Sequence, residues 1–431
     1  APRYGTNEDL KRLFDEVHKR GMHILLDLVP GHTSVDHPWF KESLKAEKNP
    51  YTDRYIWTNN IWDQPEGIGS IKGISDRDGC CVVNFFSHQP ALNYGHYICE
   101  HPWQQPMDAE GPKATVAEME KVMRFWLKMG CDGFRVDMAG SLVKNDPDGL
   151  GTIKLWQGIR PFLSKEFPEA AMVSEWGEPD KSLQAGFDMD FLLHFGPSHY
   201  NDLFRCEEPY FSSRGKGSAA AFVEKYKESR KKAGEKGLIC IPSGNHDMDR
   251  LARTMHGDEL KVAFAFLLTM PGAPFIYYGD EIGLRYVENL GSRSPMQWNH
   301  SVNFGFSNAS PEKLYIPTDD KPNSPTVEDQ MADPASLYYE VKKLIALRRA
   351  HSALLSDGDI EFVSDGADGA PLAYIRSSAD EKILVIINPA DKEAVLEVPG
   401  IWNESLYTVG GTVKAENGKR IISPKSANVL R

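Results

Sequence analysis

The stretch CDGFRVDMAG at residues 131–140 places two charged side chains at the end of an apolar strand pattern. Phe134 and Val136 alternate there with Arg135 and Asp137. An arginine and an aspartate at the end of an interior strand form either a structural ion pair or a catalytic carboxylate with its charge partner. The sequence on both sides of the stretch favours one of these two interpretations.

The same order of elements, a helix followed by a strand, recurs along the chain. A helical pattern over residues 7–21 leads into an apolar strand pattern over residues 22–29. These strands are apolar on both faces, as expected for parallel strands covered by helices, so the alternation predicts an α/β fold, either an open sheet or a barrel. The later helix and strand pairs cover residues 115–130 and 132–138, 151–167 and 170–176, 218–237 and 238–247, and 258–270 and 273–281, with one more apolar run at 187–195.

Carboxylates occur at or just beyond the C-terminal ends of these predicted strands. In a (β/α)₈ barrel all strands point the same way, so such residues converge on the face where active sites are built. A single carboxylate in this position is often a helix N-cap, whereas several together with basic residues favour an active site. The carboxylates are Asp27, Asp137, Glu175, Asp247 and Asp280, and the basic residues near them are His32, Arg135, His246 and Arg250.

The composition restricts the classes of partner. The 431 residues carry a formal net charge of −12, which argues against binding to nucleic acid and is compatible with a neutral substrate. Six cysteines show no CxxC spacing, so buried free thiols are favoured over disulfides or a zinc site. With no signal-like N-terminus and no apolar run long enough for a bilayer, we expect a cytoplasmic location, and an upstream signal peptide stays open.

The composition and the pattern of apolar residues change in two places along the sequence, and these changes predict three domains. Residues 34–110 are long, irregular and rich in aromatic residues, which indicates a small inserted domain or lid. From about residue 355, short alternating runs separated by turn residues indicate an antiparallel sheet. We therefore predict a catalytic domain over 1–350, an inserted domain over 34–110 and a C-terminal β domain over 355–431.

Several motifs, in this order along the chain, resemble those of the α-amylase family of glycoside hydrolases (family 13). They are DLVPGHTS at 27–34, QPALN at 89–93, GFRVD at 133–137, SEWGEP at 174–179, GNHDMDR at 244–250 and SPMQW at 294–298. The resemblance implies a (β/α)₈ TIM barrel with an inserted small domain and a C-terminal antiparallel β-sandwich domain. It also implies two barrel strands before the one that ends at Asp27, and this chain begins too late to contain them.

The resemblance also implies roles for individual residues. Asp137 would be the nucleophile, Glu175 the general acid and base, and Asp247 the third carboxylate, which stabilises the distorted sugar. This chemistry needs one attacking and one protonated carboxylate roughly 5–5.5 Å apart, and an apolar setting would raise the pKa of Glu175. Arg135 would keep Asp137 ionised, His32 and His246 would bind sugar hydroxyls, and Asp27 and Arg250 are assigned with them to substrate binding.

Two departures from the family pattern concern the metal and the substrate. Gly31 stands where most members carry an asparagine, which is a metal ligand in calcium-dependent relatives, so we expect no cofactor and no metal, with calcium left open. The histidines and aspartates also lack the tight helical spacing of metalloprotease ligands. The sequence DMAG, at residues 137–140, lacks a Lys-His pair typical of starch-cleaving amylases, which together with QPALN favours the oligosaccharide-cleaving, isomaltase-like branch.

The expected function is therefore that of a retaining α-glycoside hydrolase. It would cleave malto- or isomalto-oligosaccharides or starch fragments through a covalent glucosyl intermediate on Asp137. One alternative is a transglycosylase or a disaccharide isomerase of the trehalose-synthase type, which uses the same intermediate. Another is a non-catalytic sugar-binding relative. The expected partner is an α-glucan or oligosaccharide, with no nucleic acid or membrane, and the oligomeric state stays open.

Overall fold

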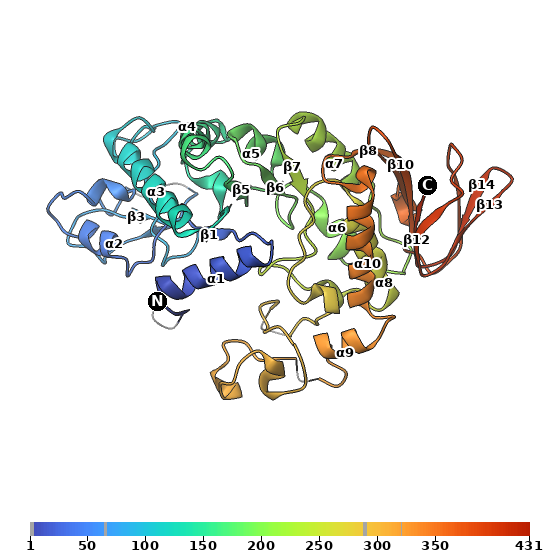
Figure 1. The fold of residues 1–431 in the computed structure, drawn as a ribbon. Coiled ribbons are helices and arrows are strands. Elements are labelled where there is room, and N and C mark those ends of the chain that lie inside the picture. Colours follow the sequence, from blue (N-terminus) through green and yellow to red (C-terminus); the bar gives the residue numbers. More distant parts are fainter. Residues whose placement is uncertain (1–3, 64–66, 288–290, 320) are drawn as a thin grey trace. The chain divides into compact units, whose positions relative to one another are not determined.

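A computed structural model of the protein describes residues 4–63, 67–287, 291–319 and 321–431 (Figure 1). The chain divides into two compact units. The first comprises Ala1–Asp190 and Ala233–Gly237, and the second comprises Phe191–Lys232 and Leu238–Arg431. The boundaries predicted for the catalytic, inserted and C-terminal domains stay predictions.

A parallel sheet forms the centre of the first unit. Its strands pair in the order β1, β4, β5 and β6, and all of these pairs are parallel. The register places Asp27 opposite Arg135 and Val136 opposite Ser174. The carboxyl ends of β1, β4 and β5 therefore meet at one edge of the sheet. The strands span Leu26–Leu28 (β1), Gly133–Val136 (β4), Ala171–Ser174 (β5) and Met189–Phe191 (β6).

Helices α1, α3 and α4 pack with this sheet around one apolar core. Phe14 of α1, Met123 of α3, Ile159 of α4 and Phe134 of β4 are all at most 1% exposed and belong to the same cluster. Burial of this apolar area is the main favourable term in the stability of the unit. The helices of the first unit span Asn7–Lys19 (α1), Pro38–Ser43 (α2), Glu110–Met129 (α3), Leu150–Glu166 (α4) and Pro179–Ala185 (α5).

The sequence specifies where these helices begin and end. Thr6 and Asp9 form a capping box at the start of α1, in which the Thr6 hydroxyl accepts from the Asp9 N–H and the Asp9 carboxylate accepts from the Thr6 N–H. Helix α3 ends at Gly130, whose φ of 120° lies in the left-handed region that glycine adopts without steric cost. The chain can therefore turn sharply into β4.

The segment between β1 and β4 contains little regular structure. Besides α2 it holds one short antiparallel pair, β2 (Ser70–Ile71) with β3 (Cys81–Val82). The QPALN stretch returns to the end of β1, where Leu92 N donates to Gly31 O at 3.0 Å and His32 forms an antiparallel bridge with Ala91. Two motifs that are far apart in the sequence thus lie side by side.

The second unit begins with a further parallel arrangement. Leu192 N donates to Cys240 O at 2.9 Å in β7 (Leu238–Cys240), and Pro242 forms a parallel bridge with Phe275. The prediction of a strand at 273–281 was wrong, because the bridge at Phe275 is the only strand-like pairing of these residues. Pro274 has no N–H for a hydrogen-bond ladder, and the chain turns into a 3₁₀ helix at Asp280–Ile282.

Two antiparallel sheets make up the C-terminal part of the second unit, as predicted. Five strands pair in the order β12, β15, β10, β9 and β8, and three pair in the order β11, β14 and β13. Their inward-facing residues form an apolar cluster that includes Leu384, Ile386 and Ile422, each fully buried. The strands span Asp359–Asp365 (β8), Leu372–Ser377 (β9), Lys382–Asn388 (β10), Ala394–Glu397 (β11), Ser405–Val409 (β12), Val413–Glu416 (β13), Lys419–Ile422 (β14) and Ser426–Leu430 (β15).

Within the described part of the chain, no helix is both long and apolar enough to cross a bilayer. None of the six cysteines, which all lie in the described part of the chain, forms a disulfide, and Cys131 and Cys240 are buried, as predicted from the apolar runs beside them. The helices of the second unit span Tyr200–Phe204 (α6), Asp258–Thr269 (α8), Val327–Ala332 (α9) and Leu337–Ala350 (α10), while α7 (Ala220–Ala233) ends at the boundary between the units.

Helix α8 is buried over most of its length, and a side chain from α10 satisfies its C-terminal end. Arg348 donates to the carbonyl oxygens of Leu268 at 3.0 Å, Met270 at 2.7 Å and Gly272 at 2.6 Å. The last carbonyl groups of a helix have no partner within the helix, so they need such a donor when they are buried. Arg348 is buried, and this burial lowers the pKa of its guanidinium.

Replacing Arg348 by methionine should lower the stability of the second unit. The substitution leaves buried carbonyl groups without a donor, which we expect to reduce the free energy of unfolding by about 3 kcal/mol. Urea unfolding followed by circular dichroism measures the change. Arg349→Met, at the exposed neighbouring position, is the control. Equal unfolding midpoints for the two variants would contradict the role given to Arg348.

Candidate active site

The first unit brings four of the predicted site residues together around one guanidinium. Arg135 lies in β4, and its Nη1 is 2.7 Å from Asp27 Oδ1 and 3.0 Å from Asp137 Oδ1. Its Nη2 is 2.5 Å from Glu175 Oε1. Three of the carboxylates predicted at strand ends therefore share one arginine.

The parallel sheet explains this convergence. Asp137 and Glu175 each follow the last residue of their strand, and the hydrogen bonding continues one residue beyond the strand ends. Asp137 N donates to Leu28 O at 2.8 Å, and Glu175 N donates to Val136 O at 2.9 Å. Because both backbones are held by the neighbouring strand, the two carboxyl groups are positioned by the most rigid part of the unit.

Glu175 has the environment of a proton donor. It is 9% exposed, and burial raises its pKa, with a further contribution from the Asp137 carboxylate. Arg135 and the Met138 N–H, which donates to Glu175 Oε2 at 3.2 Å, act in the opposite direction. The cost of removing the carboxylate from water is the larger effect, so the pKa of Glu175 lies above its ordinary value.

His32 lies beside these carboxylates on the segment that follows β1. Burial lowers its pKa, while the Asp137 carboxylate acts in the opposite direction. The imidazole is therefore neutral at neutral pH. A neutral imidazole has one donor and one acceptor, which suits the recognition of a sugar hydroxyl.

Two residues that the sequence predictions missed lie next to these side chains: Asn84 contacts His32, and Lys144 contacts Asn84. Asn84 Nδ2 is 3.3 Å from His32 Nδ1 and 3.4 Å from Met138 Sδ, and Lys144 Nζ is 3.3 Å from Asn84 Oδ1. Neither Asn84 nor Lys144 directly follows a strand of the parallel sheet or belongs to a motif. The one available signal was a single lysine in the otherwise uncharged run AGSLVKN at residues 139–145.

The second unit holds the third predicted carboxylate. Asp247 lies in the turn after β7, where its N–H donates to Asn245 Oδ1 at 2.8 Å. Its carboxylate is 2.5 Å from Arg293 Nη2 and 3.0 Å from His246 Nε2, and the side chain is 44% exposed. Arg293 was not predicted, although it directly precedes the SPMQW motif.

Arg250 and Asp280 lie in the interior of the second unit. Arg250 is 1% exposed, donates to Tyr278 O at 2.7 Å and is 3.4 Å from Asp280 Oδ1. Burial raises the pKa of Asp280, while Arg250 opposes the shift. Since the Arg250 guanidinium faces protein groups, contact with a substrate would require it to be uncovered, and its substrate-binding role stays a prediction.

The residues at the expected calcium position do not fit that ion. Gly31 has no side chain to offer, and a Cβ there would lie 2.8 Å from Asn84 Nδ2. No group of three or more His, Cys, Asp or Glu side chains that could hold a metal occurs among the described residues. That the protein uses no metal stays a prediction.

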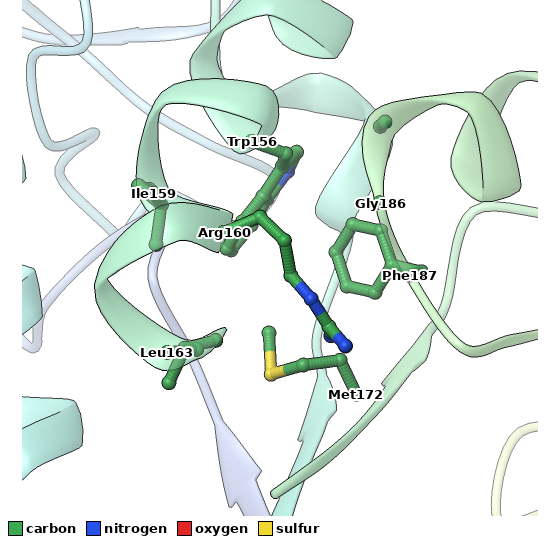
Figure 2. Close-up of a pocket in the computed structure, with 8 residues that line it drawn as sticks. Trp156, Ile159, Arg160, Leu163, Met172, Gly186 and Phe187 are labelled. Atoms are coloured by element: carbon green, nitrogen blue, oxygen red, sulfur yellow. The ribbon is translucent and has the colours of Figure 1, made fainter. Parts of the chain in front are cut away.

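The first unit also has a pocket that is not lined by Arg135 or by its partners Asp27, Asp137 and Glu175 (Figure 2). Its one charged residue, Arg160, forms two hydrogen bonds of 3.0 Å to the Asp188 carboxylate, so the guanidinium is already paired. The pocket therefore offers no group for catalysis. It is lined by Trp156, Ile159, Arg160, Leu163, Met172, Ala185, Gly186 and Phe187.

Comparison with known proteins finds relatives along the whole chain. Oligo-1,6-glucosidase from Parageobacillus thermoglucosidasius is 28% identical over 475 residues, covering 92% of this chain and 80% of that protein. Trehalose synthase from Pimelobacter sp. (strain R48) is 28% identical over 457 residues, covering 90% and 75% respectively. The solved structure of Eubacterium rectale Amy13B has a TM-score of 0.78 at 25% identity and covers 99% of this chain and 82% of that chain.

The family model described as the catalytic domain of alpha amylase matches residues 1–358. This match covers most of the chain, and the structural similarity confirms the predicted fold class, an α/β barrel fold with a C-terminal antiparallel β domain. The chain therefore belongs to the α-amylase family of glycoside hydrolases and is an enzyme that acts on glycosidic bonds.

Proposed function

We propose that the protein is a retaining α-glucoside hydrolase that acts on malto- or isomalto-oligosaccharides or starch fragments. One observation carries the proposal: Arg135 contacts both Asp137 and Glu175, and the pKa of Glu175 is raised while Asp137 lies beside the guanidinium. A pair of carboxyl groups, one protonated and one free to attack, is what retaining glycoside cleavage requires. The similarity to an oligo-1,6-glucosidase supports the choice of short oligosaccharides.

The reaction would proceed in two steps. In the first, a carboxylate oxygen of Asp137 attacks the anomeric carbon while protonated Glu175 gives its proton to the glycosidic oxygen, and the bond to the leaving sugar breaks. In the second, Glu175 takes a proton from a water molecule whose oxygen attacks the same carbon, and Asp137 is released. Two inversions return the original configuration.

The remaining residues support these steps. Arg135 offsets the charge of the carboxylates around it. Neutral His32 would bind a sugar hydroxyl. Asp247 would stabilise the distorted sugar, with its carboxylate held by Arg293 and His246. Each of these roles is a proposal that rests on the family pattern and on the contacts of the residue.

An isomerase or transglycosylase is the second candidate. It would form the same glucosyl intermediate on Asp137 but pass the glucosyl group to a sugar hydroxyl in place of water. The similarity to a trehalose synthase supports an isomerase as the second candidate function. A non-catalytic role is disfavoured, because Asp137 and Glu175 are both present and both contact Arg135.

Asp137→Asn should remove nearly all activity. The amide cannot form the covalent ester, so we expect kcat/KM on maltose or isomaltose to fall by about four orders of magnitude. Asp148→Asn, at an exposed position in a loop of the same unit, is the control and should retain wild-type activity. An Asp137→Asn enzyme that is as active as wild type would refute the mechanism.

The pH dependence should report Glu175. Because the protonated acid is the active form, kcat/KM should fall as the pH rises through the raised pKa of Glu175. Glu175→Gln cannot titrate, so its residual hydrolysis of 4-nitrophenyl α-glucoside, whose leaving group needs little protonation, should lack this alkaline decline. Profiles of both enzymes from pH 4 to 9 make the comparison. A decline at the same pH in the variant would show that another group controls it.

Product analysis separates the two candidate functions. Incubation with maltose should release free glucose in net amounts, since water is the proposed acceptor. Chromatography of the products over time measures glucose and any new disaccharide. Isomeric disaccharides without net glucose release would overturn the hydrolase proposal and favour the isomerase.

A further inference from the structure

Asp190 is a carboxylate in β6 that faces the turn after β5. It is fully buried, and its Oδ1 accepts from Ser174 Oγ at 2.8 Å and from Trp176 N at 3.1 Å. Gly177 N lies 3.5 Å from the same oxygen. Ser174 and Trp176 are the two neighbours of Glu175 in the sequence. One carboxylate oxygen therefore holds the chain on both sides of the proposed acid.

The parallel pairing of β5 with β6 brings Asp190 to this place. The register puts Ser174, the last residue of β5, opposite Asp190. Glu175 N still donates to Val136 O in the neighbouring strand, and beyond Glu175 the chain leaves the sheet. A buried N–H group needs an acceptor, and Asp190 supplies one for Trp176, which is 9% exposed. The carboxylate thus continues the hydrogen bonding of the sheet past the end of β5.

The turn after β4 holds Glu175 from the other side. Ala139 N donates to Glu175 O at 3.1 Å. The Trp176 indole packs against Gly140, where a Cβ would lie 2.5 Å from Trp176 Nε1. The backbone of Glu175 is therefore fixed between the two neighbouring strands, and loss of the contacts on the Asp190 side would let it shift.

Asp190 acts on the position of Glu175 and not on its charge. The raised pKa of Glu175 comes from burial, with a further contribution from Asp137. A glutamate side chain has several rotatable bonds, so its carboxyl group is held in a productive geometry only when the residues around it are fixed. A displacement of a catalytic group by about 1 Å can lower the rate about 100-fold. The hydrogen bonds at Ser174 and Trp176 oppose such a displacement.

We propose that Asp190 is a positioning residue for the general acid: it holds the backbone on both sides of Glu175, so that the Glu175 carboxyl group faces the bond to be cleaved. The inference deepens the proposed function and rests on it, since it requires Glu175 to give its proton to the leaving sugar. Because Asp190 is fully buried, it acts through Glu175. Its loss should therefore lower kcat more than it raises KM.

The dependence of the rate on the leaving group tests the proposal. Maltose has a leaving sugar that must be protonated, whereas the leaving group of 4-nitrophenyl α-glucoside needs little protonation. Asp190→Ala should lower kcat/KM about 100-fold on maltose, mainly through kcat, and by less than about tenfold on the nitrophenyl substrate. Equal losses on the two substrates, or full activity on maltose, would overturn the proposal.

Two further variants separate positioning from stability. Asp190→Asn keeps an oxygen acceptor at the same place, so it should recover at least about tenfold of the loss on maltose. Met123→Ala, in the buried core of the first unit, should lower the melting temperature but leave the ratio of the two activities unchanged. An Asp190→Asn enzyme no better than Asp190→Ala, or an altered ratio in Met123→Ala, would contradict a positioning role.

Ser174→Ala keeps the test available if circular dichroism shows that Asp190→Ala does not fold. This variant removes one of the hydrogen bonds to Asp190 and should change the ratio of the two activities in the same direction, by a smaller factor. A ratio equal to that of the wild type would count against the proposal.

Carbon NMR of protein labelled at the glutamate carboxyl carbons gives a readout that does not depend on activity. The Glu175 signal, assigned with a Glu175→Gln variant, should titrate at lower pH in Asp190→Ala than in the wild type. The reason is that burial is the main cause of the raised pKa of Glu175, and a loosened turn exposes the carboxyl group to water. Identical titration curves would refute the inference.

The titration also separates a failure of this inference from a failure of the proposed function. A wild-type enzyme inactive on every α-glucoside tried would count against the proposed function. The titration of Glu175 in the wild type and in Asp190→Ala would still decide whether Asp190 holds Glu175 in place.

Discussion

The contact of one guanidinium with three carboxylates is the interaction on which the candidate active site of the first unit depends. Arg135 is the neighbour of Asp27, Asp137 and Glu175 at the carboxyl edge of the parallel sheet. Burial alone would lower the pKa of Arg135, but the carboxylates raise it above its ordinary value. Without this cation, three negative charges would repel one another at the edge where β1, β4 and β5 meet. The parallel strands bring the three carboxylates together, and Arg135 offsets their charge at that edge.

The short distances between these carboxyl groups also give the two proposed catalytic carboxyl groups different protonation states. Like charges held close together in a partly dry site do not all stay ionised, and the most buried group takes the proton. The Glu175 side chain is 10% exposed, while those of Asp137 and Asp27 are 21% and 57% exposed. The difference in burial, set by the strands that carry these residues, makes Glu175 the acid of the proposed pair.

The site residues that could be predicted from the sequence are those placed by regular secondary structure. Asp137 and Glu175 could be located because apolar runs mark buried parallel strands and their carboxyl ends must meet. Asn84, Lys144 and Arg293 could not, because they lie in irregular segments whose contacts depend on tertiary folding and not on periodicity. The strand predicted at 273–281 failed for a related reason, since a proline interrupts its apolar residues, which are half-buried or exposed and form no ladder.

Two cations of the first unit, the half-buried Arg135 and the buried Lys144, act in opposite ways. The charge of Arg135 is offset by the carboxylates in contact with it. The charge of Lys144 is met only by neutral oxygens, so its field reaches His32 and opposes the pull of Asp137 on the imidazole's proton. A nucleophilic carboxylate beside a histidine would otherwise favour the imidazolium, which can only donate hydrogen bonds. Burial is the main reason that the pKa of His32 is lowered next to the proposed nucleophile, and the charge of Lys144 acts in the same direction.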